Sequence, residues 1–192
     1  MGIKTMPQLL GVGYEVLMVA LALFAYLLLD TKTRYHLIHV ATLMLIVEIW
    51  GLSTGLTTYN QELFSLYLAG VPVVMPFSWF ALIGFASFAS KGYMNYPRAL
   101  IAGALLDLLL ELPMVYSKAW SNNFGGTQIV QGYPLILPFL YGFYVLWFEL
   151  LLKYLVPKLE DRKVGPSGLL FAFAYIPTQL IISALLVSFI TI

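Results

Sequence analysis

Residues 106–113 read Leu106-Asp107-Leu108-Leu109-Leu110-Glu111-Leu112-Pro113 and place two carboxylic acids in a segment otherwise apolar enough to cross a bilayer. On a helix, Asp107 and Glu111 lie one above the other on the same face because they are four residues apart. A charged carboxylate costs several kcal/mol in the hydrocarbon core, so acids in such a segment are candidates for a functional role. The alternative is a structural pair, with both acids neutral and hydrogen-bonded between the helices of a bundle.

The composition around this stretch indicates an integral membrane protein. Of the 192 residues, 61% are hydrophobic and 10% are charged, and the mean hydropathy is +0.89, far from the average soluble domain. The absence of Cys from the sequence excludes disulfides, thiolate metal sites and Cys nucleophiles. Two His leave little for a histidine-rich metal centre, and the net charge of +1 argues against a nucleic-acid partner. We therefore expect membrane lipid around the chain, no metal and no nucleic acid.

Six transmembrane helices are predicted from apolar runs of about 20 residues that lie between charged or turn-forming breaks. They cover residues 8–29, 37–57, 70–90, 98–116, 134–156 and 167–190. The connections between them are short, which favours up-and-down packing of neighbouring helices. The sequence thus predicts an all-α polytopic helix bundle in the cell membrane, with a single domain over residues 1–192.

The orientation follows from the distribution of Lys and Arg. Eight of the ten basic residues lie in or beside the first, third and fifth connections, which the positive-inside rule assigns to the cytoplasm. These are Lys32, Arg34, Lys91, Arg98, Lys153, Lys158, Arg162 and Lys163. With an even number of spans, both termini are then predicted to face outward.

The predicted helix starts also give the depth of each acid. Counting from residue 37, Glu48 lies about 16 Å along the second helix; counting from Arg98, Asp107 lies at about 14 Å and Glu111 at about 20 Å. Glu48 and Asp107 therefore share a level near the bilayer centre. Gly51 and Gly55 form a small-xxx-small spacing that allows a second helix to approach closely, so we expect Glu48 and Asp107 to form the working pair.

Three groups of residues resemble, in order and spacing, the membrane-protein family of carotenoid biosynthesis that includes the CruF-type carotenoid hydratases. The resemblance covers about residues 41–147 and rests on Glu48, Gly51, Thr54, Gly55 and Tyr59, then Gly70, Val71, Pro72, Met75, Pro76 and Trp79, then Asp107, Leu108, Leu110, Glu111, Pro113, Met114 and Trp120. The chain departs from the family at four places. Leu106 stands where a Trp is usual, and Glu111-Leu112-Pro113 stands where an Asp-Pro pair is usual. The other departures are at Leu56-Thr57-Thr58 and near Leu137. It therefore resembles a divergent member.

The resemblance implies the hydration of a terminal C=C bond of an acyclic carotenoid. Such a reaction needs a proton donor, and a carboxyl that burial keeps neutral at pH 7 can supply the proton. We expect Asp107 to be the donor, Glu48 to position the water and Glu111 to be the third member of the group. The resemblance implies that Thr54, Tyr59, Trp79 and Trp120 contact a lipophilic polyene substrate, which enters from the lipid. No metal or organic cofactor is needed.

Two other readings remain open. The chain is alternatively a non-catalytic subunit or assembly factor of a larger membrane complex with membrane-protein partners, which would explain the departures from the family. The third reading is a proton or cation pathway through Glu48, Asp107 and Glu111, although the sequence has no evident repeat and no matching basic partner of the kind that transporters use. Thr54 and its polar neighbours also have a simple alternative role as helix caps.

Overall fold

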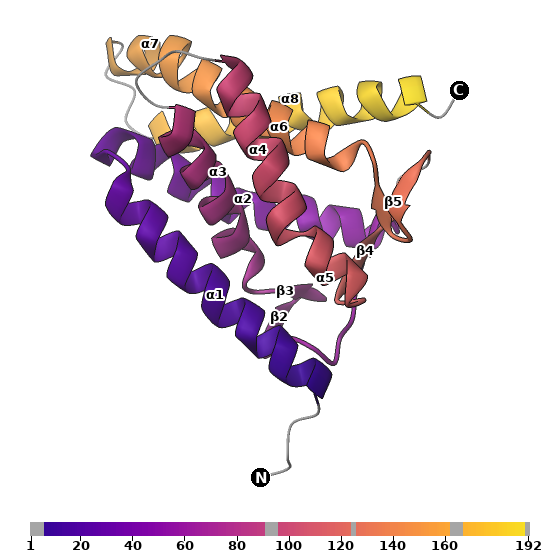
Figure 1. The fold of residues 1–192 in the computed structure, drawn as a ribbon. Coiled ribbons are helices and arrows are strands. Elements are labelled where there is room, and N and C mark those ends of the chain that lie inside the picture. Colours follow the sequence, from indigo (N-terminus) through magenta and orange to yellow (C-terminus); the bar gives the residue numbers. More distant parts are fainter. Residues whose placement is uncertain (1–5, 91–95, 124–125, 162–166, 191–192) are drawn as a thin grey trace.

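The computed structural model describes residues 6–90, 96–123, 126–161 and 167–190, and this part of the chain is mostly helical (Figure 1). The prediction of an all-α bundle is thereby confirmed in its main part. The helices are α1 (Met6–Leu28), α2 (Thr31–Ser53), α3 (Met75–Ser90), α4 (Tyr96–Leu110), α5 (Leu112–Tyr116), α6 (Leu137–Tyr154), α7 (Val156–Asp161) and α8 (Ser167–Ile190).

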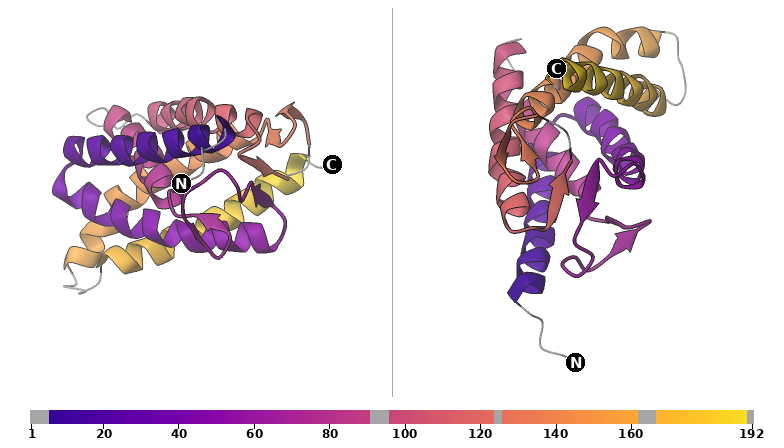
Figure 2. Two further views of the ribbon diagram at one scale, coloured as in Figure 1. Left: turned by 90° about the horizontal axis from the view of Figure 1, so that it is seen from below. Right: turned by 90° about the vertical axis from the view of Figure 1, so that its right-hand side faces the viewer.

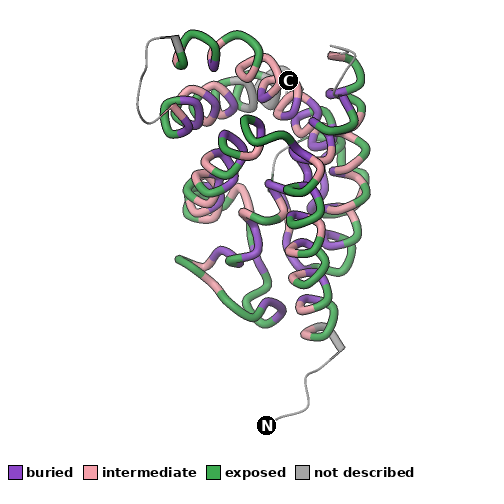
Figure 3. Tube along the Cα trace, turned by 90° about the vertical axis from the view of Figure 1, so that its left-hand side faces the viewer, coloured by how far each residue is buried: buried purple, intermediate pink, exposed green. Residues whose placement is uncertain are grey.

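Three stretches are long and apolar enough to cross a membrane, namely Gln8–Leu28, Thr31–Ser53 and Tyr96–Tyr116. Only 28%, 39% and 33% of their most apolar windows are buried inside the protein, so much of their apolar surface remains free to contact lipid. Exposed positions recur along the helices from turn to turn (Figure 3). These features indicate association with a membrane. Three of the six predicted spans are thus supported, while those over α3, α6 and α8 stay predictions.

Short strands gather at one end of the bundle, which we call the strand end. They are β1 (Thr57–Tyr59), β2 (Tyr67–Leu68), β3 (Val71–Pro72), β4 (Trp120–Asn122), β5 (Gln128–Val130) and β6 (Tyr133–Pro134). Three antiparallel pairs form, β1 with β4, β2 with β3 and β5 with β6. The pairing of β1 with β4 joins the connection between α2 and α3 to the connection between α5 and α6. Figure 2, right, looks onto this end.

The opposite end of the bundle, which we call the basic end, joins the other connections. The Lys32 ammonium lies 2.8 Å from a Glu160 carboxylate oxygen, so the start of α2 contacts α7. The Lys153 ammonium donates to the Tyr96 hydroxyl at 3.1 Å, so the end of α6 contacts the start of α4. Lys91, Arg162 and Lys163 lie outside the described residues. The described basic residues that the sequence assigned to the cytoplasm therefore lie around one end of the molecule.

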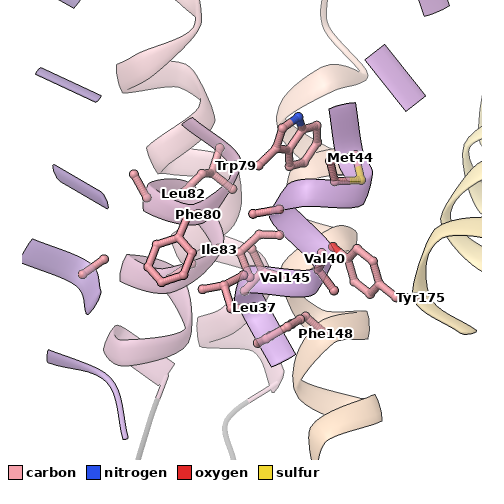
Figure 4. Packing of buried hydrophobic residues seen from close by; sticks show 14 of the residues in the cluster. Leu37, Val40, Met44, Trp79, Phe80, Leu82, Ile83, Val145, Phe148 and Tyr175 are labelled. Atoms are coloured by element: carbon pink, nitrogen blue, oxygen red, sulfur yellow. The ribbon is translucent and has the colours of Figure 1, made fainter. Parts of the chain in front are cut away.

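Two apolar clusters fill the bundle. The first lies between α1, α2, α3, α6 and α8 and includes Leu37, Ile83, Val145 and Phe148, which are 0% exposed (Figure 4). The second lies toward the strand end and includes Met18, Val71, Tyr133 and Leu140, also 0% exposed. The functional candidates lie in and around this second cluster.

The observed helix boundaries correct several predicted ones. Helix α2 begins at Thr31 rather than at residue 37, because Asp30 accepts hydrogen bonds from the Thr33 amide at 3.0 Å and from the Thr33 hydroxyl at 2.8 Å and so caps the helix. Residues 54–57, 70–74 and 134–136, which were predicted as helix, form turns and parts of β1, β3 and β6. Helix α4 ends at Leu110, one residue before Glu111 and the Pro113-containing α5.

The earlier start of α2 changes the position of Glu48. At 1.5 Å per residue, Glu48 lies about 26 Å along α2 and close to its end at Ser53. The predicted distance of about 16 Å between the start of this helix and Glu48 is therefore wrong. Glu48 instead lies near the strand end.

The predicted glycine spacing does not form a helix seam. A Cβ on Gly51 would lie 3.1 Å from the Thr57 hydroxyl oxygen of β1, and Gly55 lies beyond α2 with a φ of +75°. The close helix approach is found elsewhere, between α4 and α6. A Cβ on Gly142 would lie 2.4 Å from the Leu100 carbonyl oxygen, and one on Gly103 would lie 2.9 Å from the Gly142 Cα.

Candidate functional site

Glu48 is held by two aromatic donors. One of its carboxyl oxygens accepts from the Tyr59 hydroxyl at 2.6 Å and the other accepts from the Trp79 indole N–H at 2.7 Å. Tyr59 reaches Glu48 because β1 follows the end of α2 and turns back along it, while Trp79 lies in the first turns of α3. Glu48 is only 7% exposed. Both oxygens of this buried acid are therefore satisfied by uncharged groups.

Asp107 and Glu111 form a carboxyl pair at the junction of α4 and α5. The Glu111 backbone amide donates to the Asp107 carbonyl at 2.8 Å, so the two acids lie one helical turn apart. One carboxyl oxygen of Asp107 is buried and has no hydrogen-bond partner within the described chain. Asp107 is 0% exposed, Glu111 is 7% exposed, and the Tyr133 hydroxyl donates to Asp107. Glu111 accepts at one oxygen from the Trp120 indole N–H at 3.1 Å and from the Asn122 amide at 2.6 Å. The pair therefore places two buried acids within one helical turn of each other.

The donors around the three acids are neutral. Within the described chain, no Lys or Arg donates to Glu48, Asp107 or Glu111. Burial raises the pKa of the Tyr59 phenol, with the neighbouring Glu48 as the second cause. Burial also raises the pKa of the Tyr133 phenol, with Asp107 as the second cause. Both phenols therefore remain protonated near neutral pH and act as donors.

A cavity of about 270 Å³ reaches Glu48. It is lined by side chains of α2, α3, α6 and α8, by Leu56 and Thr57 beside it, and by Asn122 of β4, and most of the surface is apolar. We call it the apolar cavity. Its lining includes Met44, Val47, Trp50, Leu137, Tyr144 and Leu180. Its volume and lining are those of a site for part of a small lipophilic molecule.

A second cavity of about 30 Å³, which we call the small cavity, reaches Glu111. It also touches Tyr14 and Ser78, whose hydroxyls are hydrogen-bonded at 3.2 Å. This volume and these polar groups suit one water molecule. Trp79 and Tyr141 line both the small and the apolar cavity. Their rings stack with centroids 5.0 Å apart and planes 11° apart, so this stacked pair separates the two cavities.

The structure brings together most of the residues that the sequence singled out. The acid one helical turn from Asp107 is Glu111, and Asp107 lines neither cavity. The pairing of Glu48 with Asp107 stays a prediction. Tyr59, Trp79 and Trp120 all lie in the site, where each donates a hydrogen bond to an acid.

Thr54 lies apart from the acids. It is exposed, and its hydroxyl donates to the carbonyls of Trp50 at 2.9 Å and Gly51 at 3.1 Å. These bonds are those of a residue at a helix C-terminus, which is the alternative that the sequence left open.

Three site residues escaped the sequence reasoning, Asn122, Tyr133 and Tyr141. Asn122 and Tyr133 lie between predicted helices, and their acid contacts depend on strand pairing. Tyr141 lies on α6, where periodicity cannot tell a cavity wall from a packing residue. Among the described residues there is no group of three or more His, Cys, Asp or Glu side chains arranged to hold a metal ion.

Comparison of the chain with family models, with curated proteins and with solved structures found no match.

Proposed function

We propose that this chain is a membrane enzyme that adds water to the terminal C=C bond of an acyclic polyene by acid and base catalysis. The reaction is the one implied by the resemblance to the carotenoid hydratases. The chain end of a carotenoid or related isoprenoid would occupy the apolar cavity, and the rest of the polyene would remain in lipid. We also propose that six segments, α1, α2, α3, α4 with α5, α6 and α8, cross the membrane.

The observation that carries the proposal is the position of Glu48. This acid lies at the wall of the largely apolar cavity, while Glu111 lines the small cavity on the other side of the Trp79 and Tyr141 pair and Asp107 lies one helical turn from Glu111. A lipophilic cavity next to buried acids is the arrangement needed to protonate an alkene, because burial favours the protonated form of a carboxyl. A purely structural group of acids would not need such a cavity.

The roles of the acids follow from the cavities they line. Glu48 is the acid in contact with the apolar cavity, so it gives its proton to the CH carbon of the double bond and leaves a tertiary carbocation. The oxygen of a water molecule bonds to that cation, and Glu111 accepts the proton that the water loses. A proton then passes from the Asp107 and Glu111 pair to Glu48, which restores the starting state. Asp107 lines neither cavity and is thus a positioning residue that acts through Glu111.

The test is expression of the chain in cells that accumulate lycopene, followed by chromatography and mass spectrometry of the pigments. The expected product is heavier than lycopene by one water, and it should disappear in Glu48→Gln. Glu62→Gln is the matched control, because Glu62 is an exposed acid of the connection that contains β1. Unchanged lycopene in the presence of well-expressed, folded chain would count against the hydratase.

The same experiment separates the other two readings. A subunit or assembly factor would co-purify in fixed ratio with other membrane proteins and give no product. A proton or cation pathway would give no product but would acidify or depolarise vesicles that contain the purified chain, in a manner that Glu48→Gln abolishes.

A further inference from the structure

The antiparallel pair β1 and β4, which we call the ribbon, has two chemically different faces. Its register pairs Thr57 with Asn122, Thr58 with Ser121 and Tyr59 with Trp120. Because side chains alternate along a strand, Thr57, Tyr59, Trp120 and Asn122 turn toward the bundle, where the last three donate to Glu48 or Glu111. Thr58 and Ser121 turn away from it and are hydrogen-bonded to each other at 2.7 Å.

A third cavity lies on the outer side of the ribbon. It has a volume of about 730 Å³, and we call it the vestibule. Its walls carry hydroxyl and amide side chains, including Thr58, Asn60, Ser121, Asn123, Gln128 and Gln131, of which all but Ser121 are exposed. The vestibule is therefore much more polar than the cavity beside Glu48, and water is its natural occupant.

Trp120 lies between the vestibule and the acids. It is 5% exposed. Among the described residues, Trp120 alone lines both the vestibule and the small cavity. Its ring is held edge-on by Tyr14, with centroids 5.4 Å apart, and stacks on Phe64 at 6.2 Å. Its indole N–H donates to Glu111. One side chain thus separates an outer polar space from a water-sized space at an acid.

The three cavities form a series. The vestibule meets the small cavity at Trp120, and the small cavity meets the apolar cavity at Trp79 and Tyr141. Each of the two indoles at these boundaries is bonded to the acid beside it, Trp120 to Glu111 and Trp79 to Glu48. The series runs from a polar space to an apolar one.

We propose that the vestibule is the route by which water and protons reach the buried acids, and that Trp120 is the gate on this route. The role of the water as a reactant rests on the proposed function, whereas the route itself does not. Water and the lipophilic substrate would thus approach the acids from different sides, the water past the ribbon and the polyene through the apolar cavity. Trp120 is a positioning residue in this scheme, since it controls access and holds Glu111.

The experiment closes the vestibule chemically. Because the sequence contains no Cys, Thr58→Cys provides a single thiol in the vestibule, which a bulky, charged, water-soluble methanethiosulfonate can block in the folded protein. Glu62→Cys, which lies in the same connection but does not line the vestibule, is the control. The readout is the rate at which the carboxyl C=O infrared band of Asp107 and Glu111, identified by its loss in Asp107→Asn, shifts after transfer into D2O.

We expect the block at Thr58→Cys to slow this exchange by about tenfold or more, because exchange then depends on rarer openings of the structure. The block at Glu62→Cys should leave the rate unchanged. Trp120→Ala should speed the exchange, while Trp120→Phe, which retains a ring but lacks the N–H, should stay close to the parent rate. If Trp120→Ala does not fold, the labelled Thr58→Cys protein still decides the route, and exchange much faster in Trp120→Phe than in the parent would overturn the ring of Trp120 as the gate.

Equal exchange rates in blocked and unblocked Thr58→Cys protein would overturn the route. Exchange as fast in the parent as in Trp120→Ala would overturn the gate. The proposed function fails separately: if no hydrated polyene forms but the block slows exchange, the route stands and the hydratase does not. If product forms equally fast in blocked and unblocked protein, the hydratase stands and the route does not.

Discussion

At the scale of single residues, the three acids are kept in the protein by specific partners. Glu48 has a donor on each oxygen, Glu111 accepts from Trp120 and Asn122, and Asp107 accepts from Tyr133. An unsatisfied buried acid costs several kcal/mol, so these donors are needed for folding whatever the function. Mutations should therefore separate the two roles. Loss of a donor should lower the stability of the protein, whereas loss of an acid should lower the yield of product.

Tyr59→Phe tests the donors. This change removes the hydroxyl that donates to Glu48 at 2.6 Å but leaves the ring in place. Leaving one oxygen of a buried acid without its donor should lower the free energy of unfolding by about 1–3 kcal/mol. Unfolding of the purified protein in detergent measures this, with Tyr116→Phe as the control because Tyr116 is 77% exposed. An equal, small effect of both changes would show that the Tyr59 bond adds nothing to stability.

Asp107→Asn tests the proton proposed for this position. The amide oxygen can still accept from the Tyr133 hydroxyl, so this hydrogen bond and the fold should persist, but the position no longer holds a transferable proton. We expect the yield of hydrated product to fall by about 100-fold or more, the range for loss of an acid or base. Chromatographic analysis of pigments, normalised to the amount of chain, measures the loss, and Glu15→Gln is the control because Glu15 is a partly exposed acid bonded to Ser65 and lines neither the small nor the apolar cavity. Wild-type yield in Asp107→Asn would remove Asp107 from the mechanism.

At the scale of elements, the sequence predicted the helices far better than the ribbon. Long apolar runs mark α1 and α8 almost to the residue, because burial in lipid or in the core selects apolar side chains along a whole helix. Strands of two or three residues are too short to show an alternating pattern, and their pairing depends on contacts between Thr57 and Asn122, 65 positions apart. The acids were therefore predictable from the sequence, whereas Asn122 and Tyr133 as their donors were not.

The helix seam gives a prediction at the same scale. The α4 and α6 backbones approach closely at Gly142, where an added Cβ would lie 2.4 Å from the Leu100 carbonyl oxygen. Gly142→Ala should therefore push the helices apart and destabilise the protein by about 1–3 kcal/mol. Gly13→Ala on α1 is the matched control, because nothing lies within 4 Å of its added Cβ and a helical Ala is favoured over Gly by about 1 kcal/mol. Thermal unfolding of the two variants should thus shift in opposite directions.

At the scale of the whole molecule, chemistry is divided between the two ends of the bundle. The basic end carries Lys32, Lys153 and Lys158, with the first two engaged by Glu160 and Tyr96. The strand end carries the ribbon, the vestibule and the three acids. Within the described part of its connections, the basic residue is Lys118. If the bundle spans a membrane, this division sets its orientation, because Lys- and Arg-rich ends are retained in the cytoplasm. The vestibule would then open toward the outside.

Single-cysteine labelling tests this orientation. Glu62→Cys lies at the strand end and Lys158→Cys at the basic end, both at exposed positions, and the parent chain contributes no thiol of its own. In intact cells, a membrane-impermeant maleimide should label Glu62→Cys, whereas Lys158→Cys should react only after the membrane is opened. The reverse pattern would turn the vestibule toward the cytoplasm and leave the water route intact with its source changed. Labelling of both cysteines in intact cells would contradict a spanning bundle, since the two ends would then lie in the same aqueous phase. In that case, access from lipid could not explain the apolar cavity.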